Sequence, residues 1–393
     1  MNYAFSPALE ALKPSAIREI FKVLGDPEVI SFAAGNPAPE TFPAAELAGI
    51  SDMIWREKSE AAMQYGLTEG YAPLREAVTR RLREKYGVGT DTDTVIITSG
   101  GQQGVQLAAM TLCGPGDTVL CETPSFIGSL NAFRALGLNL RGVEMDEMGI
   151  LPGSLESALQ TQPRVKLLYT IPTFQNPSGI TMTAARRAEV MALCKKYGVI
   201  ILEDDPYCDI YYDGQPPAAI KSFDTDGGVI YAGSFSKTIS PGLRIGFVCG
   251  PTPVVEKMVV AKQGIDVHTN QFTQILVHEY LTRHDIDAHI LQCRDLYRVK
   301  RDRMLNACLA SAKLSEAADA VRPSGGLFLW CNLKHTADSA EFCRAAASKK
   351  VAVVPGAAFI TDVNGVSPGF RMNFTLPSLK QIDEGVGILN SLF

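Results

Sequence analysis

The sequence lacks the spacings of cysteine and histidine that mark zinc sites. Its nine cysteines contain no CxxC pair, and its five histidines contain no HExxH motif. An odd number of cysteines, several of them within apolar runs, is typical of reduced and buried thiols rather than of a disulfide framework. We therefore expect no metal site and a cytoplasmic location.

Long apolar segments and an excess of positive charge are missing as well. No apolar run approaches the ~20 residues that a transmembrane helix needs, and the N-terminus lacks the charged start and apolar segment of a secretory signal. The formal net charge of −5 gives no electrostatic reason to expect an anionic partner. We therefore expect neither nucleic acid nor a membrane among the partners.

What the sequence does contain is enough apolar material for a large core, because 46% of its 393 residues are hydrophobic. From about residue 95 to 250, short apolar runs alternate with helical patterns, which predicts a mostly parallel sheet covered by helices. Further helices and three strands predict a smaller α+β domain. The expected division is an N-terminal arm over residues 1–45 that packs with the small domain, a large domain over 46–280 and the small domain over 281–393.

A lysine lies between two of the expected buried strands, in the segment Ser234–Gly246. Burying an ammonium group costs several kcal/mol unless other groups offset it. Lys237 is therefore either a loop lysine whose amine reaches water, or a lysine kept reactive by desolvation, as a Schiff-base lysine is. In the second interpretation Ser234, Ser236 and Arg244 would hold a phosphate nearby.

Polar residues follow other expected strands too. The turn at Gly100–Gln102 precedes a helix and suits a phosphate, although glycines also make tight turns. Asp204 belongs to a run of three acids after a buried strand. This run is either an acidic turn, at the surface or at a metal, or it supplies one buried carboxylate for a cationic ring nitrogen. Because carboxyl ends of parallel strands share one edge of a sheet, we expect these clusters to meet there.

Four single residues allow two interpretations each. Phe126 follows a strand and is either a core aromatic or a ligand contact. Asn176 lies in a proline-rich loop and is either a turn residue or a polar contact. Arg371 lies in an apolar strand, so we expect a carboxylate partner, which is either an acid of the protein or a substrate. Arg18, on a helix expected over Ser15–Leu24, is either solvated or part of a site.

Together these motifs resemble the class I/II aminotransferases of the aspartate aminotransferase type, which use pyridoxal 5′-phosphate (PLP). The resemblance covers essentially the whole chain. Its elements occur in family order: Ser99-Gly100-Gly101-Gln102, Phe126, Asn176-Pro177-x-Gly179, Asp204-x-Pro206-Tyr207, Ser234-x-Ser236-Lys237 with Arg244, and Arg371-x-Asn373-Phe374. Residues 14–19 and 30–37 look like the subgroup of 2-aminoadipate, kynurenine and aromatic aminotransferases. The implied fold is the α/β PLP-dependent transferase fold of type I, and the implied enzyme is a transaminase.

The resemblance also implies residue roles. Lys237 would hold the cofactor as a Schiff base and shuttle a proton, Asp204 would pair with the ring nitrogen, and Tyr207 would contact the ring's phenolic oxygen. The implied cofactor contacts are Gly100, Gly101, Gln102, Phe126, Asn176, Asp204, Pro206, Tyr207, Ser234, Ser236, Lys237 and Arg244, with Tyr65 reaching the cofactor of a partner subunit. Gly101 and Phe126 depart from the serine or alanine and the tyrosine that many relatives carry, which leaves PLP binding possible.

Substrate contacts are implied in the same way. Arg371 would bind the α-carboxylate with help from Asn176, Arg18 would meet a distal carboxylate, and Gly35 would lie beside the substrate. The implied reaction is ping-pong transfer of an amino group from 2-aminoadipate, an aromatic or an aliphatic amino acid to 2-oxoglutarate. The implied assembly is a homodimer with shared active sites.

Two other functions remain open on this scaffold. A PLP-dependent β-eliminating lyase or decarboxylase would use the same motifs, because the bond broken at Cα depends on substrate orientation. A regulatory PLP-binding sensor of the MocR type would carry a basic winged-helix domain ahead of the aminotransferase-like part. Since the resemblance starts near residue 5 and the chain is acidic, we expect no such domain.

Overall fold

The computed structural model describes residues 1, 3–10, 12, 26 and 28–393. The helix expected over Ser15–Leu24, and with it Arg18, lies outside these residues. The described N-terminal part begins with α1 (Pro7–Glu10) and continues with β1 (Ile30–Ser31) and the 3₁₀ turn η1 (Pro39–Thr41).

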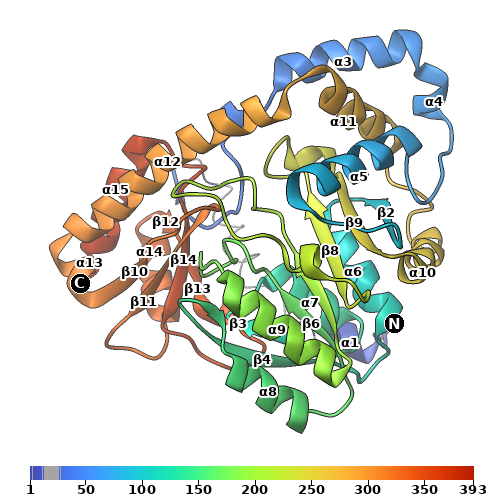
Figure 1. Cartoon of the computed structure of the whole chain (residues 1–393). Coiled ribbons are helices and arrows are strands. Elements are labelled where there is room, and N and C mark those ends of the chain that lie inside the picture. Colours follow the sequence, from blue (N-terminus) through green and yellow to red (C-terminus); the bar gives the residue numbers. More distant parts are fainter. Residues whose placement is uncertain (2, 11, 13–25, 27) are drawn as a thin grey trace.

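A large sheet forms the centre of the molecule, with strand order β2-β9-β8-β7-β6-β3-β4-β5 (Figure 1). The strands are β2 (Asp93–Thr98), β3 (Thr118–Thr123), β4 (Asn139–Asp146), β5 (Gly149–Ile150), β6 (Val165–Thr170), β7 (Ile200–Asp204), β8 (Val229–Ser234) and β9 (Gly246–Pro251). Pairing is parallel from β4 through β3, β6 and β7 to β8, whereas β9 runs antiparallel to both β8 and β2. The mostly parallel sheet expected from the sequence is confirmed.

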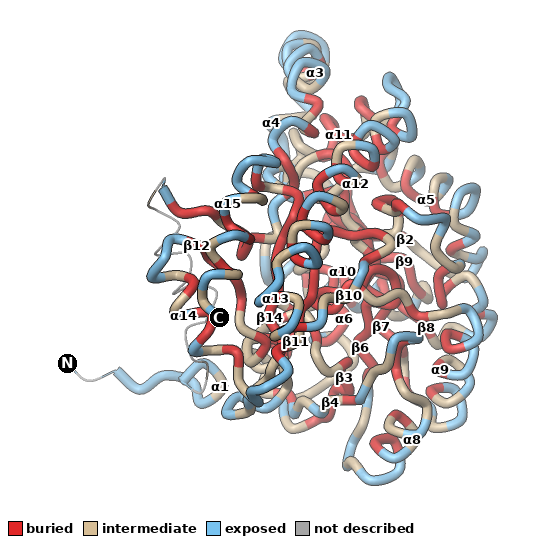
Figure 2. The backbone as a smooth tube through the Cα atoms, turned by 90° about the vertical axis from the view of Figure 1, so that its left-hand side faces the viewer, coloured by how far each residue is buried: buried red, intermediate tan, exposed pale blue. Residues whose placement is uncertain are grey.

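Helices cover both faces of this sheet. One face packs against α6 (Gly101–Leu112), α7 (Ile127–Ala135) and α10 (Thr252–Gln263). The other packs against α5 (Ala72–Tyr86), α8 (Pro152–Thr161) and α9 (Ala184–Tyr197). The strands are buried on both sides, while the outer sides of the helices are exposed (Figure 2). Each strand therefore sends alternate side chains into two separate cores.

Strand β7 shows this alternation most clearly. Leu202 belongs to the core under α6, whereas its neighbour Ile201 belongs to the core under α9. Asp204 lies two residues beyond Leu202 and so continues the α6 face, and Asp205 continues the α9 face. This alternation places the two neighbouring acids, Asp204 and Asp205, on opposite faces of the sheet.

A smaller sheet with strand order β10-β11-β14-β13 lies at the C-terminal end of the chain. It consists of β10 (Ala318–Val321), β11 (Phe328–Leu333), β13 (Val354–Pro355) and β14 (Gly369–Asn373). Strand β1 pairs in parallel with β12 (Val351–Ala352), so the described end of the arm packs against this region. The boundaries of the three expected domains stay a prediction.

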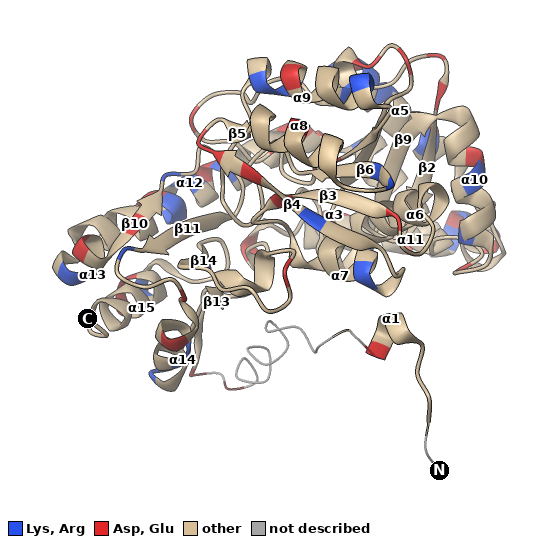
Figure 3. Ribbon diagram, turned by 90° about the horizontal axis from the view of Figure 1, so that it is seen from below, with Lys and Arg blue, Asp and Glu red and all other residues tan. Residues whose placement is uncertain are grey.

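The remaining elements connect and flank the two sheets. They are α3 (Ala44–Glu57), α4 (Ser59–Met63), η2 (Ile220–Phe223), η3 (Pro241–Leu243), α11 (Gln271–Arg283), α12 (Ile286–Ala310), α13 (Ala312–Ala317), α14 (Ala340–Ser348), η4 (Gly356–Phe359) and α15 (Leu379–Asn390). The long helix α12 runs from the region of the large sheet to the smaller one (Figure 1). Acidic and basic residues are scattered among each other over the molecule (Figure 3). Within the described ranges, no helix is long and apolar enough to cross a membrane.

Candidate active site

A cavity of about 350 Å³ lies at the carboxyl ends of the central strands. It is lined by Ala33, Ala34, Gly35, Asn36, Gly101, Gln102, Phe126, Ser129, Asn176, Asp204, Pro206, Tyr207, Ser234, Ser236, Lys237, Arg244, Phe328 and Arg371. The lining comes from the arm, the edge of the large sheet and the smaller sheet. The clusters that follow separate strands in the sequence therefore do meet, as expected for the edge of an open α/β sheet.

Lys237 lies in the segment between β8 and β9, and its amine reaches into the cavity. Its Nζ donates a hydrogen bond to the carbonyl oxygen of Gly35 at 2.8 Å. Burial, and then repulsion from the Arg371 and Arg244 guanidinium groups, lowers the pKa of Lys237 to about 8. A much larger fraction of the amine is therefore neutral near pH 7 than in an exposed lysine, and a neutral amine can attack a carbonyl.

Asp204 ends strand β7 and is buried at the floor of the cavity. Desolvation and the nearby Asp205 carboxylate raise the pKa of Asp204 to about 7, against the lowering effect of a hydrogen bond from Tyr169. The distance from Tyr169 Oη to Asp204 Oδ2 is 2.7 Å. A carboxylate in this position gains most from a cationic ligand, because opposite charge offsets its desolvation.

A cradle for an anion lies at the start of helix α6. The turn before the helix has Gly100 at a positive φ of 84°, and a Cβ at Gly100 would lie 2.3 Å from an Arg244 guanidinium nitrogen. Ser234 Oγ donates to Ser236 Oγ at 2.8 Å beside this turn. A helix N-terminus, hydroxyl groups and an arginine together suit a phosphate.

Arg371, on strand β14, is buried and has no carboxylate partner among the described residues. It donates to Asn176 Oδ1 at 2.7 Å and to the carbonyl oxygen of Ala33 at 2.8 Å. Its guanidinium lies over the rings of Phe328, 4.2 Å from the ring centre, and Phe359, at 4.8 Å. Desolvation lowers the pKa of Arg371 to about 10.

The expectation of a carboxylate partner for Arg371 is therefore not met by an acid in the described part of the chain. Two aromatic faces and two neutral oxygens hold the guanidinium in place and leave its charge without a counterion. Its Nε has no hydrogen-bond acceptor among the described residues. Of the two interpretations, this geometry favours a carboxylate supplied by a ligand.

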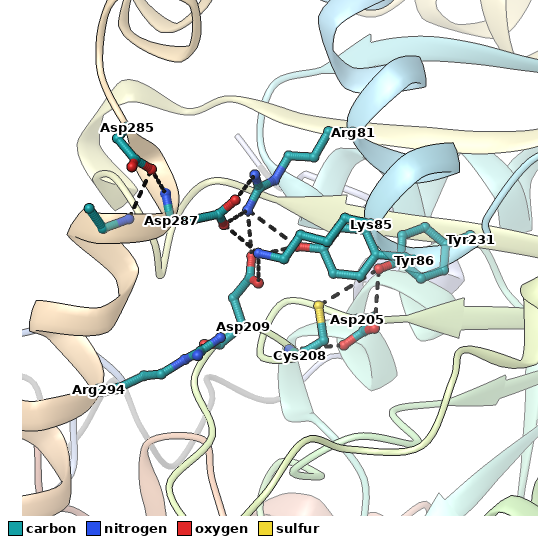
Figure 4. A network of polar contacts seen from close by, with 11 residues as sticks. Arg81, Lys85, Tyr86, Asp205, Cys208, Asp209, Tyr231, Asp285, Asp287 and Arg294 are labelled. Atoms are coloured by element: carbon teal, nitrogen blue, oxygen red, sulfur yellow. Dashed lines mark hydrogen bonds and ion pairs between the residues drawn. The ribbon is translucent and has the colours of Figure 1, made fainter.

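The loop after β7 is held by hydrogen bonds to helices α5 and α12. Asp209 accepts hydrogen bonds from Lys85 Nζ at 2.9 Å and from Tyr86 Oη at 2.7 Å, both on helix α5 (Figure 4). Its carbonyl oxygen accepts from Arg294 Nε of α12 at 2.6 Å. The same loop carries Tyr207, whose hydroxyl accepts from Asn176 Nδ2 at 3.2 Å. This network anchors the loop on which the tyrosine lies.

The structure brings together most, but not all, of the residues expected at the site. Gly100 lies directly behind the lining, against Arg244. Tyr65 is 81% exposed and does not line the cavity of its own chain. Arg18 lies outside the described residues. Sequence reasoning missed the lining residues Ala33, Ala34, Asn36, Ser129 and Phe328.

These missed residues lack a distinctive side-chain signal. Ser129 is an ordinary helix residue three positions after Phe126, and Phe328 reads as a core aromatic in a strand. Only the spacing of Ser129 from Phe126, nearly one helical turn, could have placed both on one side of α7.

The cavity fits a ligand that carries a carbonyl, a basic ring nitrogen and a phosphate. The partly neutral amine of Lys237 can react with the carbonyl, and Asp204 can pair with a protonated nitrogen. The Gly100–Gly101 turn and Arg244 offer positive charge for the phosphate. PLP carries all three groups.

The sequence model of the family "Aminotransferase class I and II" matches residues 27–389. Aromatic-amino-acid aminotransferase 1 of Thermococcus litoralis is 36% identical over 386 residues, which is 97% of this chain and 92% of that protein. The crystal structure of Pyrococcus horikoshii kynurenine aminotransferase in complex with PMP has a TM-score of 0.93 at 36% identity, and covers 98% of this chain and 96% of that one.

A third similar protein is the α-aminoadipate aminotransferase LysN of Thermus thermophilus. Its crystal structure, complexed with N-(5′-phosphopyridoxyl)-L-leucine, has a TM-score of 0.89 at 35% identity, and covers 98% of this chain and 96% of that one. The family match spans the cavity and every described segment that lines it. This chain therefore belongs to the class I and II aminotransferases, and it is a PLP-dependent transaminase of fold type I.

Proposed function

We propose that the enzyme transfers the amino group of a 2-amino acid to 2-oxoglutarate by a ping-pong mechanism, with glutamate as one product. The proposed donors are 2-aminoadipate, aromatic or aliphatic amino acids. The observation that carries the proposal is the placement around one cavity of Lys237, Asp204 and an Arg371 that has no carboxylate partner among the described residues. The names of the similar enzymes, which refer to aromatic amino acids, kynurenine and α-aminoadipate, support this range of donors.

Bound PLP supplies an electron sink for the bonds at the substrate's Cα. Lys237 would hold the cofactor by condensing its amine with the cofactor's carbonyl group, with release of water. When not bonded to the cofactor, the Lys237 amine would serve as the base that takes the proton from the substrate's Cα and returns it. The low pKa of about 8 supports this role, because a base that works near neutral pH must release its proton there.

The other lining residues hold the cofactor in the proposed function. Asp204 would pair with the ring nitrogen, and Tyr207 and Asn176 would contact the phenolic oxygen. Phe126 and Pro206, which both line the cavity, would pack against the ring and close the wall beside it. The phosphate lies in the cradle, whose groups are Gly100, Gly101, Gln102, Ser234, Ser236 and Arg244.

Arg371 binds the α-carboxylate of donor and acceptor alike, and Asn176 assists. Because Asn176 Oδ1 accepts from Arg371 at 2.7 Å, the guanidinium is oriented before substrate arrives. Gly35 would lie beside the substrate, and Arg18, which is outside the described residues, is the proposed contact for the distal carboxylate of a dicarboxylic substrate.

We also propose that the enzyme is a homodimer whose subunits share their active sites. Tyr65 supports this, because its ring is 81% exposed and touches His268 only edge-on, which leaves most of its surface available to a second subunit. Trp55, Met63 and Leu67 are exposed near it in sequence and add apolar surface. In the dimer Tyr65 reaches the cofactor phosphate of the partner subunit.

Initial rates with both substrates varied test the proposed reaction. A ping-pong transaminase gives parallel double-reciprocal lines, with 2-oxoglutarate required for steady turnover. Intersecting lines would contradict the mechanism, and turnover with ammonia release and no oxo acid present would show a lyase. Repeating the assay with 2-aminoadipate, phenylalanine and leucine as donors then identifies the preferred side chain.

A further inference from the structure

Two tyrosine–aspartate pairs flank the end of strand β7, one on each face of the sheet. On the face of the cavity, Tyr169 of β6 donates to Asp204 at 2.7 Å. On the opposite face, Tyr231 of β8 donates to Asp205 Oδ2 at 3.1 Å (Figure 4). Both tyrosines are buried. The pairs differ in their relation to the cofactor, because Asp204 lines the cofactor cavity and Asp205 does not.

The pair on the cavity side continues to a third residue. Ser129 Oγ, on helix α7, lies 2.8 Å from Tyr169 Oη. Burial and the nearby Asp204 carboxylate raise the pKa of Tyr169 far above its ordinary value, so its hydroxyl keeps its proton. An ionised Asp204 can only accept, so Tyr169 donates to it and Ser129 donates to Tyr169. The directions of the two hydrogen bonds, from Ser129 to Tyr169 and from Tyr169 to Asp204, are thereby fixed.

The other ionisable groups around Asp204 do not hold it in its charged form. Asp205 and the buried Glu122, at the end of β3, are acids, and each repels a second negative charge nearby. Tyr169 is the one residue in the described part of the chain that donates a side-chain hydrogen bond to Asp204. It occupies Oδ2 and leaves Oδ1 without a donor among those residues.

We propose that Tyr169, held by Ser129, is a positioning residue that orients the Asp204 carboxylate and keeps it an ionised acceptor for the protonated ring nitrogen of PLP. The inference rests on the proposed pairing of Asp204 with that nitrogen. A carboxylate hydrogen-bonded on one oxygen cannot rotate freely and presents the other oxygen to the ring. Tyr169 thus affects the protonation of the cofactor's ring nitrogen through Asp204, without contacting the cofactor itself.

Tyr169→Phe tests the proposal, because it removes the hydroxyl and keeps a ring that packs edge-on against Phe133, with ring centres 5.4 Å apart. We expect the apo variant to bind PLP about tenfold more weakly, as for the loss of a hydrogen bond to a charged group. We also expect the ¹⁵N resonance of the ring nitrogen in bound, labelled PLP to move towards its unprotonated position. The direction follows because a carboxylate without its donor is more basic and draws the proton away.

Tyr231→Phe is the matched control, since it removes an equally buried hydroxyl from Asp205 on the other face. It should leave the ¹⁵N resonance and the PLP affinity at their wild-type values. Equal changes in both variants would mean that the Tyr169 hydroxyl contributes only to folding, which would overturn the proposal.

Two further variants separate the possible failures. Asp204→Ala should abolish the protonated-nitrogen signal; if it leaves that signal intact, the proposed role of Asp204 itself is wrong. If Asp204→Ala abolishes the signal and Tyr169→Phe does not move it, only the inference about Tyr169 is wrong.

Should Tyr169→Phe not fold, Ser129→Ala gives the same test with a smaller expected loss of PLP affinity, about threefold. An unchanged resonance in that variant would then overturn the proposal.

Discussion

Lys237 and Arg371 are two cations that share one cavity, and neither has an acidic partner in the described part of the chain. Desolvation lowers the pKa of each group, and repulsion from Arg371 adds to the effect at Lys237. The same arrangement that leaves Arg371 free for a ligand carboxylate therefore also makes the lysine amine available as a base.

Replacing Arg371 should change the titration of Lys237. In the apo enzyme we expect the rate of PLP addition to rise with pH and to level off above about pH 8, as the amine loses its proton. Arg371→Leu removes a neighbouring positive charge, which favours the protonated amine, so the midpoint should move up towards the ordinary lysine value of 10.5. Stopped-flow absorbance across a pH series measures both midpoints.

Arg303→Leu is the control for this experiment, because Arg303 lies at the surface and pairs with Asp383. Its profile should match the wild type. A midpoint that stays near pH 8 in Arg371→Leu would show that the guanidinium does not act on the lysine.

Single residues also mark the limit of what the sequence could predict. Lys237, Asp204 and Arg371 stand out because charged residues next to buried strands need an explanation. Tyr169 and Glu122 lie in equally buried strand ends, but the sequence did not mark either as a site residue. A tyrosine in an apolar run, in particular, looks like a core residue. The roles of these residues depend on which neighbouring strand each one faces, which the local sequence does not contain.

Among the elements, strand β9 and the turn before helix α6 approach each other backbone to backbone. A Cβ at Gly246 would lie 2.5 Å from the carbonyl carbon of Gly100 and 2.6 Å from the backbone nitrogen of Gly101. Backbone atoms cannot move aside to make room for a Cβ as the end of a flexible side chain can. The strand therefore sets the position of the phosphate cradle.

Gly246→Ala should displace the cradle and weaken PLP binding about tenfold, in line with the usual effect of overpacking. Gly250→Ala, on the same strand, is the matched control, because its Cβ would meet only Ile230 atoms, at 3.5 Å or more. Equilibrium titration of the two apo variants with PLP compares them. Equal affinities would show that the contact between β9 and the turn does not shape the site.

Elements with strong local signals were predictable from the sequence. The sequence predicts a helix from Thr183 to Tyr197 that is closed by Gly198. Helix α9 begins after Thr183, whose side chain accepts from the Arg186 backbone, and ends at Gly198, at a positive φ of 66°. The sequence also predicts a strand after the glycine pair Gly325 and Gly326, and β11 begins there, at Phe328, because Gly326 has a positive φ and the chain turns at the pair. Such limits depend on tertiary contacts rather than on local pattern.

At the scale of the whole molecule, the site depends on segments that are distant in sequence. Gly35 meets Lys237 and Ala33 meets Arg371, and these contacts join the arm to both sheets. The order of motifs predicted the fold class, and the resemblance implied that Gly35 lies beside the substrate. The contacts of the arm with Lys237 and Arg371 in the cavity wall could not be predicted from the arm's own residues. A shared site in a homodimer would extend this dependence to a second chain.

Mixing two inactive variants tests whether sites are shared. Lys237→Ala should lose almost all turnover, and Tyr65→Ala should lose activity through weaker PLP binding. If Tyr65 serves the partner's site, each hybrid dimer contains one site with both residues intact. The refolded mixture should then be more active than the average of the two variants measured alone, and activity equal to that average would show that the sites are not shared.

The most direct test of the account is a single half-reaction. Holoenzyme is mixed with excess amino donor and no oxo acid, and the oxo acid and ammonia formed are quantified before and after 2-oxoglutarate is added. The account predicts about one oxo acid per chain and no ammonia, followed by glutamate formation once 2-oxoglutarate is present. Continuous release of ammonia, or no oxo acid from any of the proposed donors, would contradict it.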